Sequence, residues 1–300
     1  MTSPSGEQVE LVLDDQRAFV TEVGAGLRAY SADGRELLDG YGADELSRSG
    51  RGQMLIPWPN RIEDGVYEFE GERHQLALNQ VGERNAIHGL VRWVPWRIAE
   101  REPNRVLLRY GLHPQPGYPF FLDLAVDYLL SEQGLRVEVT ARNVGSKTCP
   151  YGAGAHPYLT VGTPTVDSLL LRAPARTVLR SDDRGIPTGQ AAVEGTAFDF
   201  RSERAIGATV LDHCFTDLER DEDGIARVEL RTPDGGGLTL WVDQSIPYLM
   251  LFTGDPLPDV ARRSLAVEPM TCPPNAFRTG QALLRLEPGA SVASSWGIAP

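Results

Sequence analysis

The chain of 300 residues is predicted to fold as an all-β protein, a large antiparallel β-sandwich. Three observations support this prediction. Short segments alternate apolar with polar residues, 31 glycines and 22 prolines interrupt the chain at frequent intervals, and long segments with the helical period of about 3.6 residues are almost absent. Many short strands separated by turns are typical of a sandwich or a barrel.

Four segments show the clearest strand pattern, because apolar side chains recur in them at every second position. These segments are 123–130, 135–143, 227–231 and 238–243. Residues 132–134 (Glu-Gln-Gly) and 234–237 (Asp-Gly-Gly-Gly) separate them in pairs, so each pair is predicted to form a hairpin. A helical turn or two is expected around 43–48 and around 197–206.

The composition is that of an ordinary globular protein, with 41% hydrophobic and 23% charged residues. No internal repeat or linker is evident, so a single domain over residues 1–300 is expected. A chain of this length buries roughly 75% of its unfolded surface and needs neither disulfides nor metals to fold. Cys149, Cys214 and Cys272 are odd in number and form no CxxC pair, so each is predicted to be a small buried hydrophobe.

The net charge of the chain indicates which classes of partner are not expected to bind it. The formal net charge is -12 and only 29 Lys and Arg residues are present, scattered along the chain. Proteins that bind nucleic acids or anionic membranes do so through clustered Lys and Arg residues, so neither is expected as a partner. The first residues lack the features of a signal peptide, and no apolar stretch is long enough for a transmembrane helix. We therefore expect a cytoplasmic protein, monomer or homodimer, that binds a small neutral molecule.

Two of the five histidines lie among small residues that would let a ligand approach the backbone closely. His88 lies in Asn-Ala-Ile-His-Gly, and His156 lies in Ala-Gly-Ala-His-Pro-Tyr. From context alone, each is more often a structural residue than a catalyst. His74 and His113 are expected on the surface or in loops. No HxH, HxxxH or HExxH spacing occurs, so a metal site is not expected.

Two further segments could carry chemistry. Glu268 ends an apolar segment before a proline-rich loop, where a stiff backbone suits a general base and equally a rigid turn. Arg61 follows Pro-Trp-Pro-Asn and could offer several donors to a polar ligand or form a structural ion pair. The aromatic residues Trp58, Trp93 and Tyr158 either stack on a ligand or belong to the core.

Six motifs, taken together and in this order, resemble the aldose 1-epimerase (galactose mutarotase-like) family over nearly the whole chain. They are 52–62 (Gly-Gln-Met-Leu-Ile-Pro-Trp-Pro-Asn-Arg-Ile), 86–89 (Ala-Ile-His-Gly), 117–120 (Gly-Tyr-Pro-Phe), 155–158 (Ala-His-Pro-Tyr), 211–213 (Leu-Asp-His) and 267–269 (Val-Glu-Pro). The sequence of residues 268–277 is similar to that of a bacterial, aldose epimerase-like subgroup. The resemblance implies a large antiparallel β-sandwich that holds the sugar in an open cleft.

The resemblance also implies a role for each matching residue. Glu268 would be the general base that removes the proton of the anomeric hydroxyl, and His156 the general acid that protonates the ring oxygen. His88 would assist near the ring oxygen. The substrate-binding residues would be Arg61, Asp212, Asn60 and Tyr158. Such an isomerase opens and recloses an aldose ring without a cofactor or a metal.

One departure from the family leaves the substrate open. Members often carry a polar residue, commonly Gln, at the position that Met250 occupies here. Two alternatives to a mutarotase of neutral aldoses therefore stay open. One is a mutarotase of an anionic sugar, phosphorylated or sulfonated, for which Arg51, Arg61 and Arg92 are candidate contacts. The other is a non-catalytic sugar-binding protein on the same fold.

Overall fold

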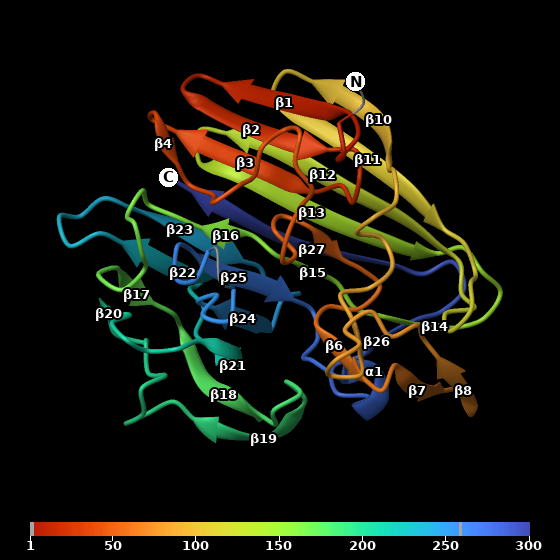
Figure 1. Ribbon diagram of the computed structural model, residues 1–300. Coiled ribbons are helices and arrows are strands. Elements are labelled where there is room, and N and C mark those ends of the chain that lie inside the picture. Colours follow the sequence, from red (N-terminus) through yellow and green to blue (C-terminus); the bar gives the residue numbers. More distant parts are fainter. Residues whose placement is uncertain (1–2, 258–259) are drawn as a thin grey trace.

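The structure is a computed structural model that describes residues 3–257 and 260–300. It confirms the prediction of an all-β fold, because the described residues form antiparallel sheets and a single four-residue helix, α1 (Ala276–Thr279). No helix in these ranges has the length and hydrophobicity needed to cross a membrane. Figure 1 shows the strands arranged as stacked layers.

A nine-stranded sheet forms one layer. In spatial order its strands are β10 (Arg97–Glu102), β11 (Arg105–Leu112), β12 (Leu122–Ser131), β13 (Gly134–Asn143), β27 (Ser291–Ala299), β23 (Gly237–Val242), β22 (Ala226–Arg231), β17 (Leu170–Arg172) and β20 (Arg204–Ala205). Both predicted hairpins belong to it: β12 pairs with β13, and β22 pairs with β23. In β13 the buried residues alternate with partly exposed ones, as the period of two requires.

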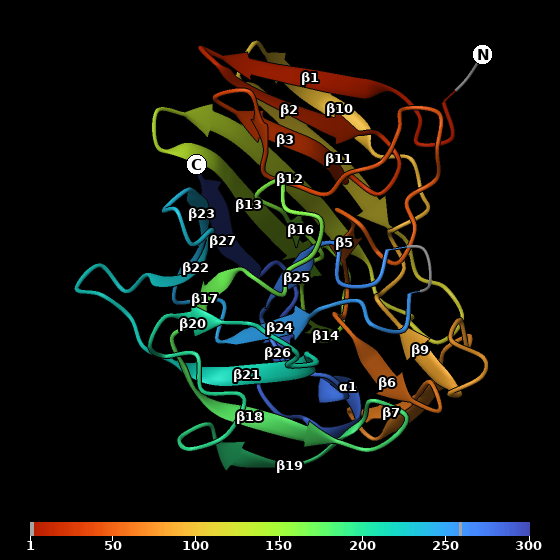
Figure 2. The same cartoon turned by 60° about the vertical axis from the view of Figure 1, so that its left-hand side comes forward.

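An eight-stranded sheet forms the layer that carries the site. Its strands are β19 (Pro187–Ala192), β18 (Ala175–Ser181), β21 (Asp212–Leu218), β24 (Tyr248–Phe252), β25 (Leu265–Met270), β15 (Gly154–Ala155) and β5 (Met54–Leu55), with β16 (Tyr158–Leu159) also paired to β25. In Figures 1 and 2, β24 and β25 lie against the part of the nine-stranded sheet formed by β22, β23 and β27. Buried apolar residues from both sheets form one continuous cluster.

Smaller sheets complete the fold. A four-stranded sheet of β1 (Gln8–Leu13), β2 (Gln16–Thr21), β3 (Leu27–Ala32) and β4 (Arg35–Glu36) covers β11 and β12 (Figure 2). Three two-stranded ribbons are β6 (Arg61–Glu63) with β9 (Asn85–Ile87), β7 (Val66–Phe69) with β8 (Glu72–Gln75), and β14 (Cys149–Tyr151) with β26 (Leu284–Leu286). The β6–β9 ribbon faces the edge of the site.

The structure corrects two expectations and confirms a third. Neither 43–48 nor 197–206 is helical, because an isolated helix this short is unstable; residues 204–205 instead form β20, which pairs with β17. His74 is buried rather than on the surface, because the alternation of β8 points it inward between Tyr67 and Phe120. The three cysteines are buried and free, as predicted.

Candidate active site

One pocket of about 600 Å³ collects all seven residues that the sequence indicated as a site. They reach it from five separate segments: Asn60 and Arg61 at β6, His88 after β9, His156 and Tyr158 around β16, Asp212 at the start of β21, and Glu268 in β25. The volume is in the range of sites that enclose small molecules. The pocket thus brings together residues from positions as far apart as Asn60 and Glu268.

Glu268 lies inside a central strand and is 3% exposed. This corrects the expectation that it ends a strand and enters a loop: β25 continues through Pro269 to Met270, since proline is compatible with an extended backbone. In the pairing of β24 with β25, Met250 stands opposite Glu268. The position of the carboxylate is therefore fixed by pairing between strands and not by the stiffness of a proline-rich loop.

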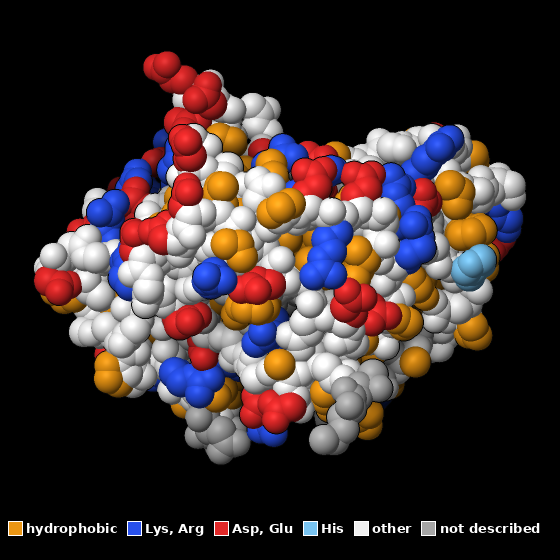
Figure 3. Space-filling model, turned by 90° about the horizontal axis from the view of Figure 1, so that it is seen from above, with side chains coloured by type: hydrophobic (Ala, Val, Ile, Leu, Met, Phe, Trp, Pro, Cys, Tyr) orange, Lys and Arg blue, Asp and Glu red, His pale blue; other side chains and the backbone are white. Residues whose placement is uncertain are grey.

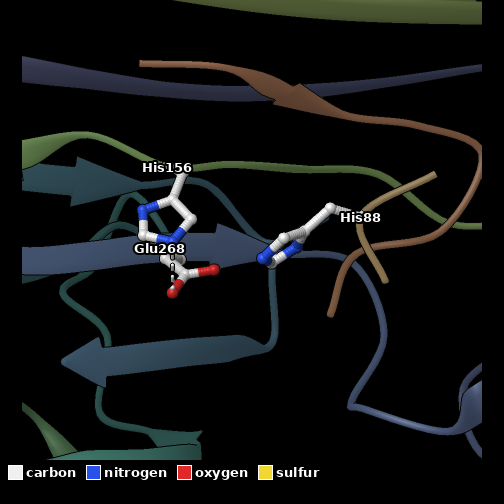
Figure 4. A group of neighbouring side chains, drawn as sticks. All are labelled: His88, His156 and Glu268. Carbon is white, nitrogen blue, oxygen red and sulfur yellow. Dashed lines mark ion pairs between the residues drawn. The ribbon is translucent and has the colours of Figure 1, made fainter. Parts of the chain in front are cut away.

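His156 connects β15 to β16 and faces Glu268. Its Nε2 lies 3.3 Å from Oε1 of Glu268, and only 4% of the residue is exposed (Figure 4). Within the described residues, Nδ1 of His156 and Oε2 of Glu268 are buried without a hydrogen-bond partner. Buried polar atoms normally have partners, so these two atoms leave unused hydrogen-bonding capacity beside the pocket.

Burial controls the protonation of this pair. It raises the pKa of Glu268 well above 4.5, and the nearby charge of Asp212 acts in the same direction. Burial, and then the charge of Arg92, lowers the pKa of His156 to about 3. Both effects disfavour the charged form of each group, so burial favours a pair that is neutral overall and holds one proton between carboxyl and imidazole.

His88 approaches the same point from the opposite side, beyond the end of β9 (Figure 4). Its Nδ1 accepts a hydrogen bond from the backbone N–H of Asn60 at 3.2 Å. A neutral imidazole whose Nδ1 accepts must carry its hydrogen on Nε2. Burial, followed by the charges of His156 and Arg92, holds the pKa of His88 well below 6.5. His88 is therefore a neutral hydrogen-bond donor.

Within the described ranges, one group of side chains has the spacing of a metal site. Ligand atoms of His88, His156 and Glu268 lie within 4.8 Å of one another. A metal ion needs a lone pair on the imidazole, whereas Nε2 of His88 carries hydrogen as long as the Asn60 bond persists. The hydrogen-bond pattern thus favours proton transfer over metal binding at this place.

Arg61 lines the pocket and is held by two neighbouring side chains. Its Nε donates to Oε1 of Gln80 at 3.0 Å and its Nη1 to Oδ1 of Asn60 at 3.3 Å. No carboxylate in the described part of the chain forms an ion pair with it. Gly185 makes room for the guanidinium, because a Cβ there would lie 2.6 Å from Nη1. The side chain of Asn60 is thus engaged in holding Arg61.

The turn between β18 and β19 was not predicted to contribute, yet Asp182, Asp183 and Arg184 line the pocket. Arg184 donates to Asp64 at 2.9 Å, and its carbonyl accepts from Asn85 at 3.0 Å. These bonds fasten the turn to the β6–β9 ribbon and close one end of the pocket. They join positions about a hundred residues apart, and no local pattern in the sequence signals such a contact.

Of the other residues considered as possible ligand contacts, some line the pocket and others belong to the core. Asp212 is exposed at the start of β21 and lines the pocket, as does Met250. Trp93 is 54% exposed at the rim, whereas Trp58 is buried against Phe277. Tyr158 lines the pocket but is only 2% exposed.

The sequence is similar to that of known proteins over most of its length. A family model described as aldose 1-epimerase matches residues 8–298. The protein YihR of Escherichia coli K12, described as uncharacterized, is 37% identical over 95% of this chain and 90% of its own length. The aldose 1-epimerase of the same organism is 30% identical over 68% of this chain and 63% of its own length. Human galactose mutarotase is 31% identical over 51% of this chain and 46% of its own.

Solved structures share the fold. The aldose epimerase homologue from C. elegans superposes with a TM-score of 0.86 at 19% identity, covering 98% of each chain. Galactose 1-epimerase from Lactobacillus acidophilus gives a TM-score of 0.79 at 23% identity, covering 97% of this chain and 93% of the other. At these identities, the likeness establishes the architecture.

Proposed function

Because the chain belongs to the aldose 1-epimerase family, we propose that it is a mutarotase, an isomerase that interconverts the α and β anomers of an aldose. One observation carries the proposal: Nε2 of His156 and Oε1 of Glu268 lie 3.3 Å apart, buried in a pocket with further hydrogen-bonding groups. Ring opening removes a proton from one oxygen and adds one to a neighbouring oxygen. A buried acid–base pair that shares one proton suits this exchange.

In the proposed reaction the shared proton resides on His156 while the anomeric hydroxyl donates a hydrogen bond to Glu268. Glu268 takes the hydroxyl proton, and that oxygen forms the aldehyde double bond. The C1–O5 bond breaks, its electron pair stays on O5, and O5 receives the proton of His156. The neutral His88 donates a hydrogen bond near O5. The aldehyde turns about C1–C2 and the same steps run backwards on its other face.

Freshly dissolved α-glucose and α-galactose, followed by polarimetry or anomeric proton NMR, provide the test. We expect the protein to accelerate equilibration of at least one of them. Acceleration of neither would reject a mutarotase of these two neutral sugars. The same assay with phosphorylated and sulfonated sugars then separates a mutarotase of anionic sugars from a non-catalytic sugar-binding protein, which would accelerate none.

The pH dependence of kcat/KM is expected to show a broad plateau, since the pair is active while it holds one proton. The lowered pKa of His156, about 3, means that a second proton binds only far below 6.5. Because the pKa of Glu268 is raised, the one proton is lost only as the pH rises through a value well above 4.5. Initial rates across the pH range test this; an acid limb near 6.5, the ordinary histidine value, contradicts it.

As a second candidate, we propose a mutarotase of an anionic sugar, because two arginines of the pocket lack acidic partners. Arg61 and Arg92 line it and form no ion pair within the described residues. Arg92 is held by Gln53 at 3.3 Å, and burial lowers its pKa to about 10, so it is still charged at neutral pH. A phosphate or sulfonate would neutralise such a cation. Arg51 is not available, because it is paired with Asp39 at 2.8 Å.

On this second proposal, Arg92→Gln lowers kcat/KM for a phosphorylated or sulfonated sugar by roughly 10- to 100-fold, the effect of one charged hydrogen bond. The rate with a neutral sugar changes far less. Arg17→Gln is the matched control, since Arg17 pairs with Glu10 on the surface and does not line the pocket. Equal losses for neutral and anionic sugars would count against an anionic substrate.

We further propose one domain over residues 1–300, a cytoplasmic location and a monomer or homodimer that binds a monosaccharide but neither nucleic acid nor membrane. The three free thiols support a reducing compartment. On the face seen in Figure 3, basic and acidic side chains are interspersed, which does not favour a polyanionic partner. Light scattering after gel filtration measures the oligomeric state.

A further inference from the structure

Five consecutive residues, 49–53, contact His156 or its neighbour Tyr158; we call them the clamp segment. The N–H of Gly52 donates to the carbonyl of His156 at 2.9 Å, and the N–H of His156 donates to the carbonyl of Gln53 at 3.1 Å. The carbonyl of Ser49 accepts the hydroxyl of Tyr158 at 2.9 Å. Backbone bonds therefore fix the main chain of His156 on both sides.

Tyr158 fixes the ring of His156. The two rings are stacked, with centroids 4.8 Å apart and planes within 9°. The guanidinium carbon of Arg51 lies 4.2 Å from the centroid of the Tyr158 ring. With these neighbours and 2% exposure, Tyr158 has no open ring face for a sugar.

Arg51 is itself immobilised. It donates to a carboxylate oxygen of Asp39 at 2.8 Å, and Asp39 also accepts from Ser264 at 2.8 Å and from Arg263 at 2.7 Å. Arg51 and Asp39 are largely buried, so the network holds a well-defined geometry. The stack of Arg51, Tyr158 and His156 therefore rests on a rigid base.

The backbone of Gly50 packs directly against the imidazole ring of His156. A Cβ at this position would lie 2.6 Å from Cδ2 of His156, closer than such atoms approach, and 3.1 Å from Cγ, which is a tight contact. Its backbone also has a φ of 78°, which favours glycine. Any side chain here must push the imidazole away from its place beside Glu268.

We propose that the clamp segment and Tyr158 are a positioning device that sets the orientation of the His156 imidazole toward Glu268. The proposal rests on the proposed function, because it assigns Tyr158, expected from the sequence to contact the sugar, a role that acts through the acid. Proton transfer depends on the placement of the two groups, and a misplacement of about 1 Å can cost roughly 100-fold in rate.

The first test compares two glycines. Gly50→Ala is expected to lower kcat by roughly 10- to 100-fold while KM changes little, because the sugar contacts stay and the acid is displaced. Gly71→Ala is the matched control: its φ is 76°, close to that of Gly50, and a Cβ there meets nothing within 4 Å. It carries the same backbone strain and should retain kcat.

A second pair of variants tests the stack. Tyr158→Phe keeps the stacked ring and loses only the bond to Ser49, so its loss in kcat should be smaller than that of Tyr158→Leu, which should fall like Gly50→Ala. The NMR signals of the His156 ring should follow the same order: large shifts in Tyr158→Leu and Gly50→Ala, smaller shifts in Tyr158→Phe, and nearly unchanged signals in the control Gly71→Ala.

Two results would overturn the positioning role. One is equal kcat for Gly50→Ala and Gly71→Ala; the other is a rise in KM with unchanged kcat in Tyr158→Leu, which is the signature of a lost sugar contact. If the wild type accelerates no sugar, the proposed function fails, while the His156 signals of the four variants still decide whether the clamp segment orients this ring.

Discussion

Glu268→Gln is expected to lower kcat by roughly 10²- to 10⁴-fold, the contribution of one positioned proton transfer. Glutamine has nearly the shape of glutamate and fits the same place between β24 and β16, but it cannot take the proton of the anomeric hydroxyl. KM should change little, because Arg61, Asp212 and His88 still line the pocket. Anomeric NMR with both sugars measures the loss.

The same substitution is expected to stabilise the fold, increasingly so at higher pH. Because the pKa of Glu268 is raised in the folded protein, the stability that its proton contributes is fully present below about pH 4.5 and is lost as pH rises through the folded pKa. Glutamine has no charge to bury. The Tm of the variant minus that of the wild type should therefore be larger at about pH 8 than at about pH 5.

Glu36→Gln provides the control, since Glu36 lies exposed in β4 away from the pocket. It should change neither kcat nor the pH dependence of Tm. A loss in Glu268→Gln of less than about threefold would argue against Glu268 as the base. A gain in Tm that is the same at every pH would argue against a buried, raised carboxyl.

The fold could be predicted because its signals are local. Alternation is visible locally, over residues 135–143, and these residues pair with β12 and β27. Glycine and aspartate at 234–237 mark a turn wherever they occur between strands. The predictions for His74 and for residues 204–205 were wrong for the same reason. Their environments are set by partners distant in sequence, Phe120 for His74 and β17 for 204–205.

The site could be predicted only as far as its residues carry motifs. His88, His156 and Glu268 each lie in a recognisable segment, but the sequence does not show which atom of His88 carries the hydrogen. That depends on a single backbone N–H, that of Asn60. Gly50 and Gly185 look like ordinary loop glycines, although a Cβ on either would strike a side chain of the pocket. Such close approaches are properties of the folded chain.

His156→Gln is expected to lower kcat by roughly 10²- to 10⁴-fold, like the loss of the base. The glutamine amide can still donate a hydrogen bond to the ring oxygen, but it cannot release a proton to it. His113→Gln makes the same chemical change at an exposed histidine outside the pocket and should leave kcat unaltered.

The double variant Glu268→Gln with His156→Gln distinguishes a shared proton from two independent catalysts. If the two residues act on one proton, removing either one already breaks the exchange. The kcat of the double variant should then lie within about tenfold of the kcat of the slower single variant. Independent catalysts would instead multiply their losses, to roughly 10⁴- to 10⁸-fold. Because mutarotation also proceeds unaided, the residual rates must be measured at high protein concentration against a blank. A multiplied loss would contradict the single shared proton that the 3.3 Å contact and the opposite pKa shifts of the two groups support.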